Sequence, residues 1–259
     1  MKVKIYQIDA FTDKVFSGNP AAVCPLENWI DDAVMQNIAS ENNLAETAFF
    51  VKENSGYNIR WFTPVTEVEL CGHATLASAY VIFNILNTAT ENITFSSLSG
   101  PLFVERDGKK IVLDFPSIPP ESCDFPMKLV EALGAEPESV MSCNNYFVIY
   151  SSEEEIVSIE PDFKLLSELD LHAVIITAPG RDVDFVSRFF APKFGIPEDP
   201  VTGSAHCTLI PYWADRLNKK RLKARQLSRR GGELFCEDLG KRVKISGYAM
   251  NYLEGIIEV

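Results

Sequence analysis

The sequence predicts an α+β protein of two pseudo-symmetric domains, each a curled sheet of short strands around one central helix. Residues 60–64 (RWFTP) return, about half the 259-residue chain later, as residues 188–192 (RFFAP). Each copy leads to a glycine turn, 71–74 (CGHA) and 202–205 (TGSA), and then to a long apolar segment. A motif repeated at half-length indicates two similar domains. We expect the two glycine turns to face one interdomain cleft.

The first half alternates short strands with two helices. Residues 31–42 are predicted as a helix because Ile30, Val34 and Ile38 follow helical spacing. Residues 72–86 are predicted as a second helix, apolar nearly all round and therefore buried on every side. Alternation and turn signals predict strands at residues 2–11, 21–24, 48–51, 58–62, 93–96, 102–105 and 110–114.

The second half repeats this plan after a proline-rich linker at residues 116–120 (PSIPP). We therefore expect an N-terminal domain over 1–115 and a C-terminal domain over 121–249, with a final strand near 250–259 that could rejoin the first. The second apolar helix is predicted over 204–217 despite Pro211. The strands expected in this half are residues 146–150, 173–177, 185–190, 233–236, 241–246 and 256–259.

Composition indicates a cytoplasmic protein. The net charge of −12 and pI of about 4.8 argue against a general nucleic-acid binder. A basic run at 219–230 is interpreted as a solvated face or loop. No apolar run reaches about 18 residues, so no membrane span is expected. The six cysteines form no CxxC pair, which favours free thiols in a reducing cytoplasm.

The two glycine turns are the first candidate binding elements. A helix start offers unpaired N–H groups and partial positive charge, and glycine lets a ligand approach the backbone. Gly72 and Gly203 could therefore clamp an anion, most simply a substrate carboxylate. The alternative is ordinary helix capping, with Thr202 or Ser204 as the cap.

Three further side chains could carry acid–base chemistry. Glu46 precedes an apolar strand and is a candidate general base or acid, although it could equally cap a turn. His73 lies in a first helical turn, where an imidazole can donate a proton or orient a substrate group. Asp199 precedes Pro200 and by itself reads as a turn residue. His206 is expected to be a satisfied core histidine.

Cys71 suggests a nucleophile or an acid–base thiol at a helix start. A racemase of the two-cysteine type needs a second thiol at the equivalent place, which holds Thr202 instead. Cys207 lies five residues later, so the symmetric two-thiol mechanism fails. We expect no metal and no cofactor, because no metal-ligand spacing, GxGxxG or P-loop string is present.

Six strings resemble one known family. They are residues 9–12 (DAFT), 17–20 (SGNP), 43–47 (NLAET), 62–64 (FTP), 70–75 (LCGHAT) and 198–207 (EDPVTGSAHC). In these strings the chain resembles the PhzF-like (phenazine-biosynthesis-like) family. The resemblance implies a diaminopimelate-epimerase-like fold, usually in a homodimer. The family's characterised member isomerises a dihydro-hydroxyanthranilate ring without cofactor, and its base and three supporting residues match Glu46, His73, Asp199 and Ser204.

The expectation is therefore a cofactor-independent isomerase that moves a proton between carbons of a small, cyclic, carboxylate-bearing substrate. Glu46, His73, Asp199 and Ser204 are the expected catalytic residues. The residues expected to contact the substrate are Gly72, Gly203, Thr202, Cys71 and Asn19. The alternatives are an amino-acid epimerase or racemase using Cys71, and a non-catalytic binding or scaffold protein that kept the fold.

Overall fold

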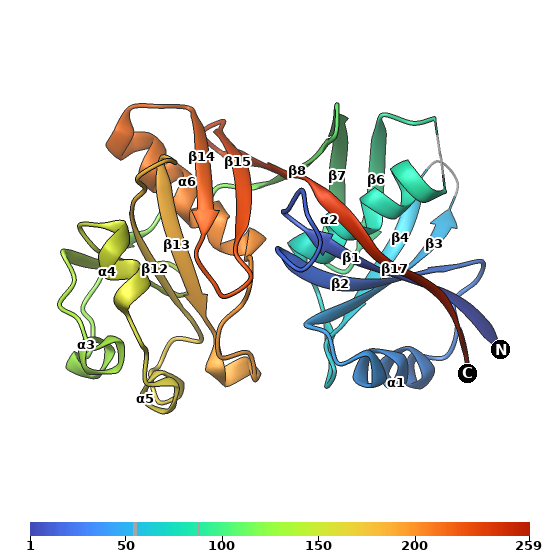
Figure 1. The fold of residues 1–259 in the computed structure, drawn as a ribbon, viewed down its shortest axis with the longest axis horizontal. Helices are drawn as coiled ribbons and strands as arrows, with labels where there is room; N and C mark the ends of the chain where they lie inside the picture. The colour runs from blue at the N-terminus through green and yellow to red at the C-terminus, as the bar shows by residue number, and fades with distance from the viewer. Residues whose placement is uncertain (54–55, 87–88) are drawn as a thin grey trace. The chain divides into compact units, whose positions relative to one another are not determined.

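A computed structural model describes residues 1–53, 56–86 and 89–259 (Figure 1). The chain divides into two compact units. The first comprises Met1–Phe115 and Ile245–Val259, and the second comprises Pro116–Lys244. None of the helices in these described ranges is long and apolar enough to cross a membrane.

The first unit is a curled sheet in which each strand pairs with the next in the order β17, β1, β2, β3, β4, β6, β7 and β8. The pairs β2–β3 and β4–β6 are parallel, and the others are antiparallel. The strands are β1 (Lys2–Ala10), β2 (Asn19–Leu26), β3 (Glu46–Glu53), β4 (Gly56–Phe62), β5 (Glu67–Val68), β6 (Asn92–Ser97), β7 (Gly100–Asp107), β8 (Lys110–Pro116) and β17 (Ala249–Glu258).

The second unit repeats the pairing pattern of the first. The step β11–β12 is parallel like β2–β3, and β13–β14 is parallel like β4–β6. The antiparallel steps β12–β13 and β14–β15 match β3–β4 and β6–β7. The strands are β9 (Glu121–Ser122), β10 (Ser139–Ser142), β11 (Tyr146–Ile149), β12 (Val174–Pro179), β13 (Phe185–Phe190), β14 (Arg221–Gln226), β15 (Gly232–Asp238) and β16 (Arg242–Gly247). The sequence repeat is therefore a repeat of topology.

In each unit one apolar helix follows the repeated motif, residues 60–64 in the first unit and 188–192 in the second. Helix α2 (Gly72–Tyr80) continues as a π-helix over Val81–Ile85 and contacts β1, β2 and β3. Helix α6 (Gly203–Leu217) contacts β14 and β15 (Figure 1). Residues 73–79 of α2 are all buried, as the all-round apolar pattern predicts. The expected helix over 72–86 is therefore an α-helix that widens in its last turn.

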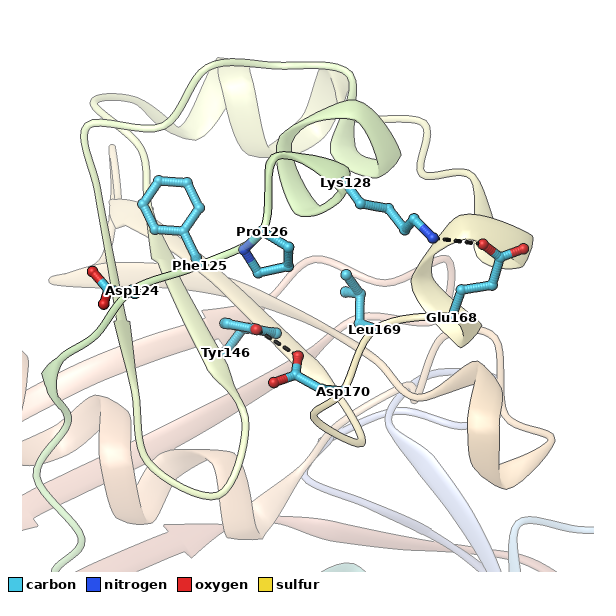
Figure 2. Close-up of a pocket in the computed structure, with 8 residues that line it drawn as sticks. All are labelled: Asp124, Phe125, Pro126, Lys128, Tyr146, Glu168, Leu169 and Asp170. Atoms are coloured by element: carbon cyan, nitrogen blue, oxygen red, sulfur yellow. Dashed lines mark hydrogen bonds and ion pairs between the residues drawn. The ribbon is translucent and has the colours of Figure 1, made fainter.

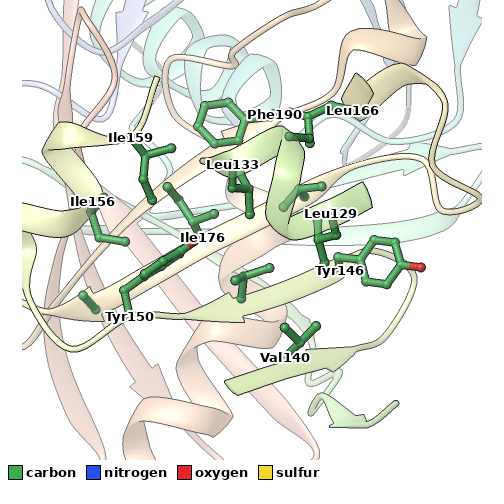
Figure 3. Packing of buried hydrophobic residues seen from close by; sticks show 14 of the residues in the cluster. Leu129, Leu133, Val140, Tyr146, Tyr150, Ile156, Ile159, Leu166, Ile176 and Phe190 are labelled. Atoms are coloured by element: carbon green, nitrogen blue, oxygen red, sulfur yellow. The ribbon is translucent and has the colours of Figure 1, made fainter. Parts of the chain in front are cut away.

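Shorter helices cover the outer faces. In the first unit α1 (Asp32–Asn42) is capped by the Asp31 side chain and packs Met35 and Ile38 against Phe49. The second unit carries α3 (Met127–Leu133), α4 (Glu153–Ser158) and α5 (Phe163–Ser167). Figure 3 shows Leu129 and Leu133 of α3 packed with Ile176 of β12 and Phe190 of β13.

Several sequence predictions need correction. The helices α3, α4 and α5 were not expected, because at five to seven residues they carry too little periodicity. Of the two readings of the basic run, a solvated face or a loop, the face is right for β14: exposed and buried residues alternate, so its lysine and two arginines project from one face of a strand. Glu46 is the first residue of β3 rather than a residue before it.

The second unit spans 116–244, whereas the sequence predicted 121–249. The difference arises because β16 carries the chain back into the first unit at residues 244–245. The final strand, β17, pairs with β1 from Lys2↔Glu258 to Ala10↔Ala249. It is therefore a strand of the first unit.

Candidate active site

The first unit brings together four of the predicted site residues. Asn19 begins β2 and Glu46 begins β3, and these strands are parallel, with Ala21 opposite Glu46. Their first residues therefore meet at one end of the sheet. The start of α2 supplies Cys71 and His73.

A glycine turn makes the position of Asn19 possible. Gly18 has φ +67°, in the left-handed region that favours glycine. A Cβ at this position would lie 2.1 Å from the carbonyl oxygen of Ala10. Only glycine lets the chain reverse this closely against β1 and enter β2 at Asn19. The Ser-Gly-Asn-Pro string is thus explained by backbone geometry.

His73 is the centre of this cluster. Its Nε2 lies 3.2 Å from Oε2 of Glu46. Its Nδ1 lies 3.2 Å from the amide nitrogen of Asn19 and 3.5 Å from the sulfur of Cys71. When the imidazole is neutral, Asn19 donates to Nδ1 and the ring proton is on Nε2. When the imidazole is charged, both nitrogens carry protons, so Nδ1 can donate to the Cys71 sulfur and no longer accepts from Asn19. In either state an N–H points toward Glu46.

The surrounding charges control the protonation of the site. Burial acts to lower the pKa of His73, but the hydrogen bond to Cys71 and the charge of Glu46 raise it above its ordinary value. Burial, reinforced by the Glu46 charge, raises the pKa of the Cys71 thiol to about 11. The thiol is therefore protonated at neutral pH and adds no charge. The attraction between Glu46 and the imidazolium is the interaction that favours the charged histidine.

Two enclosed polar atoms of the cluster have unused hydrogen-bonding capacity. Within the described part of the chain, Oε2 of Glu46 and Nε2 of His73 lack an aligned hydrogen-bond partner, although they face each other. Buried polar atoms are nearly always hydrogen-bonded, and exceptions often mark catalytic groups. The Glu46 side chain remains 13% exposed, so a ligand can reach it.

Glu46, Cys71 and His73 are also a possible set of metal ligands. One ligand atom from each residue lies within 4.8 Å of the others. However, the sulfur of Cys71 contacts Nδ1 of the ring while the carboxylate contacts Nε2. An ion bound to one ring nitrogen would be turned away from the ligand at the other. The arrangement is better suited to proton transfer along the ring than to chelation.

The second unit holds Asp199 and Thr202 in a buried network. The Thr202 hydroxyl donates to Oδ2 of Asp199. Gln226, at the end of β14, accepts from the Thr202 backbone N–H at 2.9 Å and donates to the Asp199 carbonyl at 2.8 Å. Asp199 is therefore more than a turn residue. The sequence did carry a signal for Gln226, since it continues the buried face of Leu222 and Ala224 where an apolar residue is expected.

Neither helix start is capped by a side chain. The residues preceding α2 and α6, Cys71 and Thr202, make no capping hydrogen bond. The capping alternative for Thr202 is therefore wrong, because its hydroxyl is engaged by Asp199. Ser204 is exposed in the first turn of α6, so its hydroxyl is accessible. Anion binding at the two helix starts stays a prediction, and no side-chain cap stands in its way in the described ranges.

His206 is buried, as expected for a core residue, but it is only partly satisfied. Its Nδ1 lies 2.8 Å from the carbonyl oxygen of Thr202, while its Nε2 has no hydrogen-bond partner in the described ranges. Burial lowers its pKa to about 4, although the bond to Thr202 opposes this. His206 is therefore neutral near pH 7.

Each of the two repeated arginines pairs with a glutamate that lies shortly before a helix start. Arg60 forms a bidentate pair with Glu67, with both distances 2.7 Å. Arg188 pairs in the same way with Glu198, at 2.7 and 3.1 Å. Each glutamate precedes a glycine turn, so each arginine ties a strand to the segment that leads into the buried helix. The repeated arginine is a positioning element rather than a ligand-binding one.

A surface cavity of about 410 Å³ lies elsewhere in the second unit (Figure 2). Its wall includes Tyr146, which donates to Asp170 at 2.6 Å, and Lys128, which pairs with Glu168 at 2.9 Å. None of the predicted site residues lines it. The cavity therefore shares no residue with the two clusters described above.

Comparison with known proteins places the chain in a family. A family model described as phenazine biosynthesis-like protein matches residues 8–255. The chain is also 50% identical to an uncharacterized isomerase of Pseudomonas aeruginosa, over the full length of both proteins. The chain belongs to the phenazine biosynthesis-like family. The family resemblance and the fold class predicted from the sequence are therefore confirmed.

Solved structures support the same placement of this phenazine biosynthesis-like chain. A PhzF-family phenazine biosynthesis protein of Enterococcus faecalis is 50% identical, with a TM-score of 0.98 and complete coverage of both chains. A hydroxyproline epimerase of Agrobacterium vitis matches 99% of this chain and 92% of its own, with a TM-score of 0.62 at 9% identity. The epimerase likeness shows a shared fold only. The phenazine biosynthesis-like fold is thus a curled α+β fold that epimerases also use.

Proposed function

We propose that this protein is an isomerase that needs no cofactor and moves a proton between two carbons of a small, cyclic carboxylate. Glu46 takes a proton from a carbon next to a carboxyl-bearing or unsaturated group. The C–H bond breaks, its electron pair enters the conjugated system, and the proton rests on the Glu46 carboxylate. Glu46 then returns the proton to another carbon of the same molecule, which restores the carboxylate.

The observation that carries this proposal is the Glu46–His73 pair. A carboxylate that serves as a base must be positioned, ionised and reachable. The Glu46 carboxylate lies 3.2 Å from the His73 imidazole, and its partial exposure leaves it reachable. His73 also places positive charge where the substrate becomes more anionic as its proton leaves.

The helix starts provide the second part of the proposed site. The N–H groups at Gly72–His73 and at Gly203–Ser204 would hold the substrate's negative charge, because neither start is closed by a capping side chain. Asp199 would orient a polar substrate group, and the exposed Ser204 hydroxyl would donate to the substrate. The small anionic substrate and a second copy of the chain remain the expected partners.

The racemase alternative is weaker than the isomerase. A thiol with a pKa of about 11 is a poor base at neutral pH. The equivalent residue, Thr202, has its hydroxyl committed to Asp199. Cys71 and Thr202 therefore do not form the pair of acid–base groups that a symmetric two-base mechanism needs.

Solvent proton exchange tests the proposal. The protein would be incubated in D2O with a panel of cyclic carboxylates, including cyclohexa-2,5-diene-1-carboxylate, and deuterium incorporation followed by proton NMR. We expect exchange at the carbon next to the carboxyl group. Glu46→Gln keeps the side-chain shape but cannot accept the proton, so exchange should fall by about 10²–10⁴-fold. Binding of the same carboxylates, measured by calorimetry, should persist.

Glu53→Gln, at the exposed far end of β3, is the matched control and should exchange like the wild type. Trans-4-hydroxy-L-proline in the panel tests the epimerase alternative directly. Absence of exchange with every compound, or undiminished exchange in Glu46→Gln, would contradict the proposed chemistry.

A further inference from the structure

Gln226 makes three hydrogen bonds to one short loop. Its Oε1 accepts from the Thr202 backbone N–H at 2.9 Å. Its Nε2 donates to the Asp199 carbonyl at 2.8 Å and to the Thr202 hydroxyl at 3.1 Å. The Gln226 side chain is fully buried, and Asp199 and Thr202 are almost so. One side chain therefore spans the loop from residue 199 to residue 202.

These contacts impose a direction on the hydrogen bonds. An amide NH2 can only donate, so the Thr202 oxygen must accept from Nε2 of Gln226. The Thr202 proton is then left to donate to Oδ2 of Asp199, where the two oxygens are in contact. The same amide orientation satisfies the two backbone contacts, because its oxygen faces an N–H and its nitrogen faces a carbonyl. The three groups form a chain from Gln226 through Thr202 to the Asp199 carboxylate.

The position of this series of hydrogen bonds, from Gln226 to Asp199, gives it a functional consequence. Thr202 immediately precedes α6, and Asp199 lies three residues earlier in the same loop. A second strut, the Arg188–Glu198 pair, holds the residue before Asp199. The backbone N–H of Asp199 is bonded to Phe189 of β13 at 3.0 Å. The loop is therefore tied to β13 and β14, and the hydrogen bonds that start at Gln226 end at the Asp199 carboxylate.

We infer that Gln226 is a positioning residue, which acts through Thr202 to orient the Asp199 carboxylate for the substrate. The inference rests on the proposed function of Asp199. It also explains why the second repeat has threonine where the first has Cys71. The Thr202 hydroxyl transmits the contact from Gln226 and is not available as an acid or base.

Two readouts in the full-length protein test the inference. In Gln226→Met, amide exchange at Thr202, measured by NMR, should speed up because the acceptor for its N–H is lost. Turnover of the compound identified in the exchange panel should fall by up to about 100-fold, as misplacement of a catalytic group can cost. Because the lost interaction belongs to the transition state, kcat and kcat/KM should fall together. Gln7→Met, a half-buried glutamine of β1, is the matched control and should change neither readout.

A double-mutant cycle tests the route through threonine. Thr202→Val removes the hydroxyl at constant shape, and Thr202→Ser restores a hydroxyl. We expect Thr202→Val to lose turnover, Thr202→Ser to regain most of it, and the double variant with Gln226→Met to be no worse than the more impaired single variant. If Gln226→Met does not fold, the comparison of Thr202→Val with Thr202→Ser decides whether the Thr202 hydroxyl transmits the contact. Equal turnover in these two variants would overturn the inference.

The possible outcomes separate this inference from the proposed function. Unchanged Thr202 exchange in folded Gln226→Met, a purely additive double variant, or an effect on KM alone would overturn the positioning role. If Thr202 exchange speeds up as expected while Asp199→Asn keeps full turnover, the positioning contact stands and the proposed role of Asp199 fails.

Discussion

At the residue scale, the chemistry of the first cluster depends on His73 joining groups from three parts of the chain. Asn19 comes from β2, Glu46 from β3 and Cys71 from the start of α2. The ring can hold a proton on the nitrogen facing Glu46 whether it is neutral or charged. The thiol is a neutral neighbour, because its pKa is about 11.

Cys71→Ser therefore should not abolish proton transfer. A hydroxyl can replace the neutral thiol beside His73, so the rate of solvent exchange should fall by no more than about tenfold, below the loss typical of a proton-transfer group. Iodoacetamide labelling of the wild type at pH 7.5 should be slower at Cys71 than for free cysteine, since little thiolate is present. A loss of about 10³-fold in Cys71→Ser, or rapid labelling, would favour a thiol mechanism.

His206 predicts a pH dependence of stability. Its folded-state pKa of about 4 lies below the ordinary value near 6.5 because burial disfavours the charge. Between these values the unfolded chain binds the proton and the folded chain does not. The free energy of unfolding should therefore fall as pH drops from about 6.5 to 4, by up to about 3 kcal/mol.

Urea denaturation at several pH values measures this effect. In His206→Leu the free energy of unfolding lost between pH 6.5 and 4 should be smaller by that amount, so the acid-side slope is shallower, whatever the variant's overall stability. His172→Gln, at an exposed histidine, is the control and should keep the wild-type slope. An unchanged slope in His206→Leu would show that the acid sensitivity arises elsewhere.

At the element scale, each apolar helix begins without a side-chain cap and is held by an arginine–glutamate pair. The pairs Arg60–Glu67 and Arg188–Glu198 occupy matching places in the two repeats. Arg60 and Arg188 also lie over Phe62 and Phe190, at 5.2 and 4.9 Å from the ring centroids. In both repeats an uncapped helix start is thus preceded by a mostly buried arginine–glutamate pair.

The Arg188–Glu198 pair should contribute measurably to stability. Both side chains are mostly buried and the pair is bidentate, so a double-mutant cycle of Arg188→Met and Glu198→Gln should give a coupling free energy of about 1–3 kcal/mol. The Arg221–Glu237 pair, whose arginine is 84% exposed, is the control and should give less than about 1 kcal/mol. Urea denaturation measures both cycles. Equal coupling in the two pairs would mean that Arg188 is not a structural support.

At the scale of the whole molecule, the two units share a topology but not a set of functional groups. In the strand pairings, Thr47 opposite Phe62 corresponds to Val174 opposite Phe190, so the counterpart of Glu46 is Ala173. The residue three positions before Cys71 is Val68, where the second repeat has Asp199. The duplicated fold has therefore diverged. The two candidate site carboxylates, Glu46 in the first unit and Asp199 in the second, lie at non-equivalent places. This asymmetry suits one base with supporting groups better than a symmetric pair of bases.

The terminal strand gives a prediction at this scale. Because β17 pairs with β1 along its length, removal of residues 249–259 should expose one edge of β1. Amide exchange measured by mass spectrometry should then increase in β1 and β2, with little change in β11 and β12 of the other unit. Removal of Glu258 and Val259 alone is the control and should leave most of this protection. Equal loss of protection in both units would show that β17 supports the whole chain.

The sequence by itself determined the repeat, the two apolar helices and the family. These features are local or periodic: a glycine turn, an all-round apolar run and a short string such as residues 198–207 can be read without knowing what lies nearby. Glu46, His73, Asp199 and Ser204 were found in the same way. Their roles stay predictions until proton exchange is measured.

Only the tertiary structure decided which groups touch. Asn19, Glu46 and His73 are far apart in sequence, and the parallel β2–β3 pairing together with the start of α2 makes them neighbours. Gln226 stands in a basic run that predicts a solvated segment, yet its strand turns it inward to hold Asp199 and Thr202. Contacts of this kind depend on strand register and burial, because a hydrogen bond forms between groups that the fold brings within about 3 Å, whatever their separation along the chain.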